Sequence, residues 1–294
     1  MSFSLTTKPS IENVVKNPVV LDGIGFHTGE RNVVRLEHNR NGDGLFVVQG
    51  QERYKIHPSA VSTKQRTSSI VEGDRMIAMT IEHLLSALYA LKIRNLLIAF
   101  EKGNEIPILD GSAASYMQRI EPEIGPVQKE VDVLEVDETV RQEAQGDADR
   151  FIQIEPADSD VLSIRSTVSY PDSRIRQQEQ CFHFGSLEEY RREIACARTS
   201  FPFTIESAAA IEQTRARLKG AIFSGELKNV NVYSSWDTDG TRYENEVARH
   251  KILDFLGDMK VLNIELSPHI SVQLFRTGHA INNALARRIS ASLS

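Results

Sequence analysis

Short apolar runs separated by turn-forming residues dominate the first third of the chain. They occupy residues 19–21, 33–36, 44–48 and 96–100, and Gly- and Asn-rich segments such as 39–44 lie between them. This pattern predicts short strands. Residues 80–91 differ because they are almost entirely apolar, which predicts a buried helix with Thr80 as its N-cap.

The rest of the chain also alternates strand-like and helix-like segments. Strands are predicted at residues 131–136, 151–155, 162–168, 222–223, 230–233 and 270–274, and helices from about 112 to 117 and at 187–194, 207–218, 244–256 and 278–292. The segment 121–126 contains two prolines and a glycine and is the best candidate for a linker. We therefore predict an α+β protein with two similar domains, residues 1–125 and 126–294, rather than a single doubly wound sheet.

One predicted helix carries three polar residues spaced four apart. His250, Asp254 and Asp258 share a face, because side chains at i and i+4 lie one above the other, while apolar residues occupy the flanking sides. An imidazole and a carboxylate at this spacing can reach one divalent metal ion. The alternative is an ordinary solvated face, since charged residues usually contact water.

The apolar helix at 80–91 has Glu82 and His83 as its only ionisable groups. In a buried helix both would be desolvated unless they line a cavity or bind something. The alternative is a hydrogen-bonded core histidine beside a glutamate of the first turn.

Composition restricts the function classes. The chain has 294 residues, 40% hydrophobic and 25% charged, as in an ordinary globular protein, and its apolar stretches are too short to cross a bilayer. Residues 1–16 lack the pattern of a signal peptide, so we expect a cytoplasmic protein with no integral membrane segment.

A net charge of −6 argues against nucleic-acid binding. Cys181 and Cys196 lack C-x-x-C spacing, so neither a thiolate zinc site nor a disulfide is indicated.

Seven short motifs extend over nearly the whole chain. They are Gly23–Gly29, Thr80–Leu85, Ile106–Ala113, Ala197–Thr199, Arg249–Asp254, Gly257–Asp258 and Gly278–Asn283. In this order they resemble the motifs of UDP-3-O-acyl-N-acetylglucosamine deacetylases, the zinc enzymes of lipid A synthesis. Each motif alone is weak, but their shared order makes accidental similarity improbable.

The resemblance implies a fold and a set of roles. It implies two α+β domains, each a β-sheet with helices, whose helices are sandwiched between the two sheets, with the active site at their junction. The implied metal ligands for Zn²⁺ are His83, His250 and Asp254. Glu82 would be the general base and His279 the general acid, supported by Asp258. Thr199 would face the oxyanion, and Lys251 would lie near the phosphates of an acylated UDP-amino-sugar.

The resemblance also implies an insert near residues 200–225 that shelters the acyl chain. Phe201, Phe203 and Lys219 are the candidate substrate contacts there. The sequence departs from the family pattern at 199–225 and again at 224–229, which leaves the chain-length preference and the exact acyl sugar open. We expect a monomer.

Other assignments remain possible. The same metal chemistry could serve another nucleotide-linked or acylated amino sugar, or the chain could be a non-catalytic module that binds nucleotides or acyl chains. The joint presence of a base, an acid and three ligands weighs against the module. Among weaker candidates, His27 is interpreted as a structural or supporting histidine, and Asp110 as a residue that caps the following helix or closes a turn.

Overall fold

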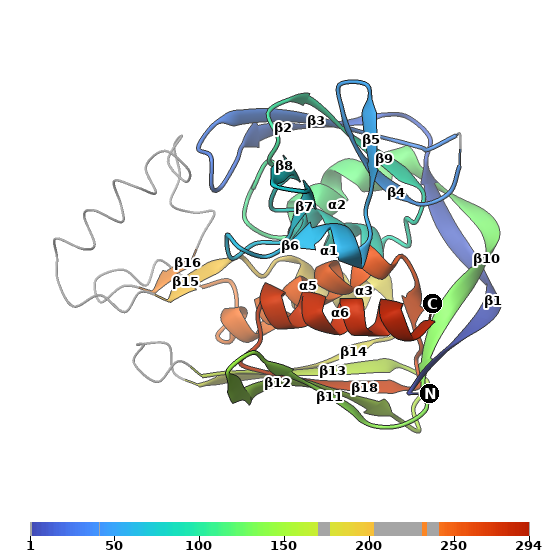
Figure 1. Cartoon of the computed structure of the whole chain (residues 1–294), viewed down its shortest axis with the longest axis vertical. Helices are drawn as coiled ribbons and strands as arrows, with labels where there is room; N and C mark the ends of the chain where they lie inside the picture. The colour runs from blue at the N-terminus through green and yellow to red at the C-terminus, as the bar shows by residue number, and fades with distance from the viewer. Residues whose placement is uncertain (1, 41, 170–176, 203–230, 234–240, 294) are drawn as a thin grey trace, which may run out of the picture.

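Helices lie between two sheets, and a long two-stranded ladder runs along one side of the molecule (Figure 1). The computed structural model describes residues 2–40, 42–169, 177–202, 231–233 and 241–293. Apolar residues of both sheets and of the helices between them form one continuous core. The predicted α+β class with helices sandwiched between two sheets is confirmed.

The first sheet has the order β2-β3-β9-β4-β5. Its strands are β2 (Val19–Ile24), β3 (Arg31–Glu37), β9 (Leu96–Lys102), β4 (Leu45–Gln49) and β5 (Glu52–Lys55), and only the β4–β9 pair is parallel. Alternate residues, including Leu21, Val34, Leu36, Val47 and Ile98, are fully buried, as expected for a sheet with one face in the core. A smaller antiparallel sheet contains β6 (Val61–Ser62), β7 (Ser69–Glu72) and β8 (Arg75–Ala78), and a short 3-10 helix, η1 (Pro58–Ala60), precedes it.

The second sheet has the order β11-β12-β18-β13-β14. Its strands are β11 (Val140–Ala144), β12 (Asp147–Pro156), β18 (Ile270–Phe275), β13 (Leu162–Val168) and β14 (Gln178–Phe184), and only the β13–β18 pair is parallel. It too buries one face, through residues such as Ile152, Ile164 and Phe182. Two short strands, β15 (Ser200–Pro202) and β16 (Asn231–Tyr233), pair in parallel as a separate sheet.

The helices between the sheets come from both halves of the chain. They are α1 (Glu82–Ala90), α2 (Ala114–Ile120), α3 (Leu187–Tyr190), α5 (Glu246–Met259) and α6 (His279–Leu293), with a short 3-10 helix η5 (Lys260–Leu262) after α5. The helix predicted at 187–194 is α-helical only to Tyr190 and continues as a π-helix, η3 (Arg191–Ala195). None of the described helices is long and apolar enough to span a membrane.

The segment predicted as a linker, residues 121–126, has regular structure. Residues 121–123 form a 3-10 turn, η2 (Glu121–Glu123), and Ile124 begins β10 (Ile124–Val136). This strand pairs in antiparallel register with β1 (Phe3–Val15) along its whole length, from Phe3 opposite Val136 to Val15 opposite Ile124. Pro126 is tolerated because β17 (Glu265–Leu266) pairs only with the far end of β10, which leaves one edge of the strand open near the proline. The domain boundary near residue 125 stays a prediction.

Thr80 is not the N-cap of α1. The cap position is Ile81, whose side chain makes no capping hydrogen bond. Thr80 instead adopts a left-handed backbone conformation, with φ of 57°, and its hydroxyl donates to the buried carboxylate of Glu105. The same carboxylate accepts the backbone N–H groups of His27 and Thr28, so it ties the Gly23–Gly29 loop to the start of α1.

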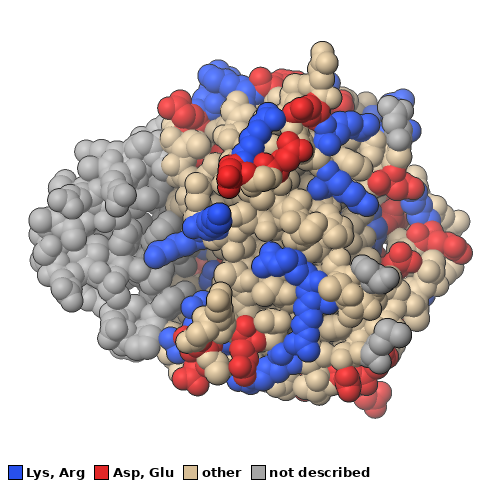
Figure 2. Space-filling view, in the orientation of Figure 1, with Lys and Arg blue, Asp and Glu red and all other residues tan. Residues whose placement is uncertain are grey.

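Charged side chains are dispersed over the visible surface. On the face shown in Figure 2, the described basic residues stand in separate groups among uncharged and acidic residues rather than in one continuous patch.

Candidate active site

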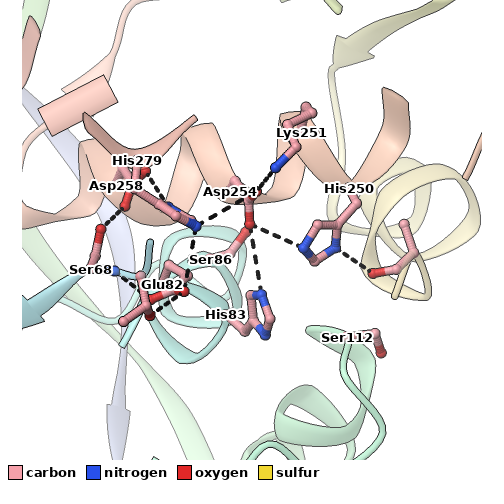
Figure 3. Close-up of polar contacts among 12 residues, drawn as sticks. Ser68, Glu82, His83, Ser86, Ser112, His250, Lys251, Asp254, Asp258 and His279 are labelled. Carbon is pink, nitrogen blue, oxygen red and sulfur yellow. Dashed lines mark hydrogen bonds and ion pairs between the residues drawn. The ribbon is translucent and has the colours of Figure 1, made fainter. Parts of the chain in front are cut away.

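Three potential metal ligands from two helices meet between the sheets. His83 lies in the first turn of α1, and His250 and Asp254 lie one turn apart on α5 (Figure 3). Their candidate ligand atoms all lie within 4.8 Å of one another. Asp254 Oδ1 is 3.1 Å from His250 Nε2 and 3.7 Å from His83 Nε2. All three side chains are at most 3% exposed, so the cluster is not a solvated face of a surface helix.

The protonation pattern of this cluster fits a bound divalent cation. His250 Nδ1 is 3.0 Å from the carbonyl oxygen of Ala197. A carbonyl only accepts, so Nδ1 carries the proton, and because burial keeps the ring neutral, Nε2 presents a lone pair towards Asp254. Asp254 Oδ1 is buried and makes no hydrogen bond. The lone pairs of His250 Nε2 and Asp254 Oδ1 are thus buried and face each other. This arrangement is unfavourable unless a cation lies between them, and a metal ion would be that cation.

The pKa values of the cluster favour the ligand forms. Burial lowers the pKa of His250, which keeps its ring neutral. Burial alone would raise the pKa of Asp254, but the interaction with the adjacent His250 ring and the positive charges of Lys251 and His279 outweigh it and hold the pKa well below its ordinary value. Lys251 Nζ donates to Asp254 Oδ2 at 2.6 Å, which leaves Oδ1 available to a metal ion.

Glu82 lies beside the triad and is held at both oxygens. Thr67 Oγ1 donates to Oε1 at 2.6 Å, and the backbone N–H of Ser68 donates to Oε2 at 3.1 Å. His279 Nε2 is 3.6 Å from Oε1 and 4.0 Å from Asp254 Oδ2. A carboxylate and an imidazole therefore stand next to each other at the edge of the candidate metal site (Figure 3).

Asp258 is the partner of His279. Its Oδ2 is 3.0 Å from His279 Nδ1 and accepts a hydrogen bond from Asn282 Nδ2, while its Oδ1 accepts the Ser68 hydroxyl. Burial disfavours the charged imidazolium, but the carboxylates of Asp258, Glu82 and Asp254 outweigh this cost and raise the pKa of His279 to about 10. His279 is therefore arranged to hold a proton at neutral pH.

Close helix packing brings α1 and α5 together. A Cβ atom added at Gly257 would lie 2.0 Å from the backbone carbonyl oxygen of Glu82. Only glycine permits this approach, which sets His83 opposite the face of α5 that carries His250 and Asp254.

The segment 197–199 is held by partners on both sides. The π-helix η3 ends just before it, and the Arg198 guanidinium and backbone N–H both contact the buried carboxylate of Glu246. The Thr199 N–H donates to the Gly111 carbonyl of the first half at 2.8 Å. Asp110 closes the turn there by accepting the Ser112 N–H, as predicted, and also accepts from Arg242.

The structure brings together most of the residues predicted for the site. Glu82, His83, His250, Lys251, Asp254, Asp258 and His279 form one connected cluster. Thr199 is half-buried and follows the segment whose carbonyl contacts His250. Phe201 lies in β15, but its side chain is outside the described part of the chain, as are Phe203 and Lys219 and the helix predicted at 207–218. His27 is exposed and uses its backbone rather than its ring to bind Glu105.

Sequence reasoning missed the residues that orient the acid–base groups. They are Thr67, Ser68, Asn282 and Asn283, all at most 1% exposed. The two asparagines belong to a motif noted in the sequence, and their position on the apolar side of a helix was a usable signal. Thr67 and Ser68 lie in a polar loop that offers no such signal.

Comparisons with known proteins agree in one assignment. The model of the UDP-3-O-acyl N-acetylglycosamine deacetylase family matches residues 12–291. Three similar proteins named UDP-3-O-acyl-N-acetylglucosamine deacetylase come from Aquifex aeolicus, Nautilia profundicola and Helicobacter hepaticus. They are 32%, 33% and 34% identical to this chain, each over 95% of its length, and the matches cover 93%, 92% and 89% of those proteins.

Proposed function

The chain belongs to the UDP-3-O-acyl N-acetylglycosamine deacetylase family, and from this premise we propose that it is a zinc-dependent hydrolase. It removes the N-acetyl group of UDP-3-O-acyl-N-acetylglucosamine and releases acetate, a step of lipid A biosynthesis. The observation that carries this proposal is the buried His83–His250–Asp254 cluster with Glu82 and His279 at its edge.

Zinc is the metal that this ligand set supports best. Two imidazoles and one carboxylate are a common set in catalytic zinc sites, in which a further position remains for water. When bound, zinc acidifies water and polarises the scissile carbonyl group. Imidazole and carboxylate ligands also suit iron(II) and cobalt, so the metal has to be measured.

Glu82 is proposed as the general base. Glu82 directly precedes the candidate ligand His83 in the sequence, and each of its carboxylate oxygens accepts a hydrogen bond. It takes a proton from the attacking water as the new C–O bond forms. The two donors also limit rotation of the carboxylate, so its position is set before substrate arrives.

His279 is proposed as the general acid. Breakage of the C–N bond leaves an amine that departs readily only when it is protonated, and His279 Nε2 can supply that proton. Asp258 accepts from the other ring nitrogen and stabilises the imidazolium before the transfer. The Thr199 hydroxyl is proposed to donate to the former carbonyl oxygen as negative charge develops there.

Substrate contacts complete the proposal. Lys251 has a 16% exposed side chain beside the ligand carboxylate, so its ammonium can lie near the phosphates of the nucleotide. Phe201 and Phe203 are proposed to contact the acyl chain, and Lys219 the phosphates. We also expect the protein to be a monomer, which sedimentation analysis can test.

Acetate release from synthetic substrates tests the function. The purified protein should release acetate from the 3-O-acylated UDP-sugar much faster than from the unacylated UDP-N-acetylglucosamine. A chelator should abolish the reaction, and zinc should restore it. Equal rates on both sugars would refute the assigned substrate, and a folded protein that takes up no transition metal would refute the hydrolase.

A further inference from the structure

Two adjacent polar residues, Thr67 and Ser68, are buried beside the site although neither is a candidate ligand, base or acid. They lie just before β7 and are 1% and 0% exposed. Buried hydroxyl groups are unfavourable unless they are hydrogen-bonded. The partners of these two hydroxyls therefore indicate what the segment does.

Both residues contact Glu82. The Thr67 hydroxyl donates to one carboxylate oxygen and the Ser68 N–H donates to the other. In addition, the Ile81 N–H donates to the Ser68 carbonyl at 3.1 Å. The segment is thus bonded to the start of α1 through its side chain and its backbone, and it sets the plane of the Glu82 carboxylate.

Ser68 also contacts the partner of His279, and the direction of that hydrogen bond can be assigned. Asn283 Nδ2 is 3.0 Å from the His279 carbonyl oxygen and 2.9 Å from Ser68 Oγ. The carbonyl only accepts, so the amide nitrogen must face both groups, and Ser68 Oγ accepts its second proton. The Ser68 hydroxyl therefore donates a hydrogen bond to Asp258 Oδ1 at 2.5 Å.

This chain of hydrogen bonds leaves Asp258 Oδ2 for His279. Ser68 occupies one oxygen of Asp258 and its N–H occupies one oxygen of Glu82, so a single residue holds the groups that flank the imidazole. We propose that Thr67 and Ser68 are positioning residues that set the separation of Glu82 from His279, an inference that rests on the proposed deacetylase function. Neither residue touches substrate or metal in this role.

The neighbouring serine provides a matched control. Ser69 is 1% exposed, but its buried hydroxyl has no hydrogen-bond partner. Ser68→Ala and Ser69→Ala remove the same atom from adjacent buried positions, and only the first breaks the chain of hydrogen bonds. Thr67→Val and Thr67→Ser form a second pair, because valine keeps the shape and loses the hydroxyl while serine keeps the hydroxyl.

Steady-state kinetics and metal analysis of the four variants test the inference. Ser68→Ala and Thr67→Val should lower kcat about 10- to 100-fold, the usual effect of losing a supporting hydrogen bond at a metal site, with KM nearly unchanged and full metal content. Ser69→Ala should match the unchanged protein, and Thr67→Ser should recover most of the kcat. A Ser68→Ala variant as active as Ser69→Ala overturns the inference, and so does loss of metal in parallel with activity, which indicates a purely structural role.

A second readout does not depend on activity. The His279 Nδ1 proton, held by Asp258, should give a sharp NMR signal in the unchanged protein that broadens in Ser68→Ala and persists in Ser69→Ala. Should the unchanged protein release no acetate, the proposed function fails, and this signal alone decides the inference: broadening supports it and an unaffected signal overturns it.

Discussion

Replacement of Gly257 by alanine tests whether close contact between α1 and α5 assembles the site. Gly257 lies inside α5, between the candidate ligand Asp254 and the His279 partner Asp258. Helix propensity alone predicts that alanine stabilises this position by about 1 kcal/mol relative to glycine. Packing against α1 predicts that alanine destabilises the protein. The sign of the change in the free energy of unfolding therefore shows which effect is larger.

The structure gives the size of the steric conflict. The alanine Cβ would lie 2.0 Å from the Glu82 carbonyl oxygen, while ordinary contacts begin near 3.4 Å. The obstacle is backbone, so the helices must move apart by about 1 Å or more, and overpacking of this kind costs typically 1–3 kcal/mol. After subtraction of the propensity gain, we expect a net destabilisation of up to about 2 kcal/mol. Because metal sites tolerate about 0.2 Å in ligand distance, metal affinity should fall by at least about tenfold.

Thermal unfolding of the metal-free protein and zinc titration measure the two effects. Gly185→Ala is the control, because its Cβ would meet side-chain atoms rather than backbone, at 3.0 Å from Glu189 Oε2 and 3.3 Å from Val161 Cγ1. Its metal affinity should equal that of the unchanged protein. A Gly257→Ala variant that is more stable and binds zinc normally would refute the argument that this contact sets the ligand geometry.

Three further outcomes are expected. Asp254→Ala should purify with far less than one metal ion per chain by elemental analysis and release no acetate, since two histidines rarely hold the metal tightly; full metal content would contradict the assigned ligand set. Asp258→Asn should move the alkaline limb of the kcat profile to lower pH, because the neutral amide no longer raises the pKa of His279; a limb at the same pH would show that another group is the acid. In the metal-free protein, the His279 contribution to the free energy of unfolding should be complete below pH about 6.5 and be lost as the pH rises through about 10, because the folded-state pKa is raised; unfolding curves that match those of His279→Gln across this window would contradict it.

Errors in the predicted elements arise where distant pairing overrides local composition. Residues 121–126 have the prolines and glycine of a linker, yet most of the segment becomes a turn and a strand because β1, more than 100 residues earlier in the chain, pairs with it. Thr80 has the composition of an N-cap, but its hydroxyl bonds to Glu105 instead. Neither partner is visible in the local pattern.

The sequence by itself determined the features that depend on one helix. His250, Asp254 and Asp258 had to share a face because the helical backbone repeats every 3.6 residues, and a nearly all-apolar helix had to be buried with Glu82 and His83. Only the tertiary structure decided that His83 meets Asp254, that Glu82 stands beside His279, and that Thr67 and Ser68 orient both groups. Those relations depend on helix contact at Gly257 and on loop-to-helix hydrogen bonds between residues as many as 215 positions apart, which no local periodicity encodes.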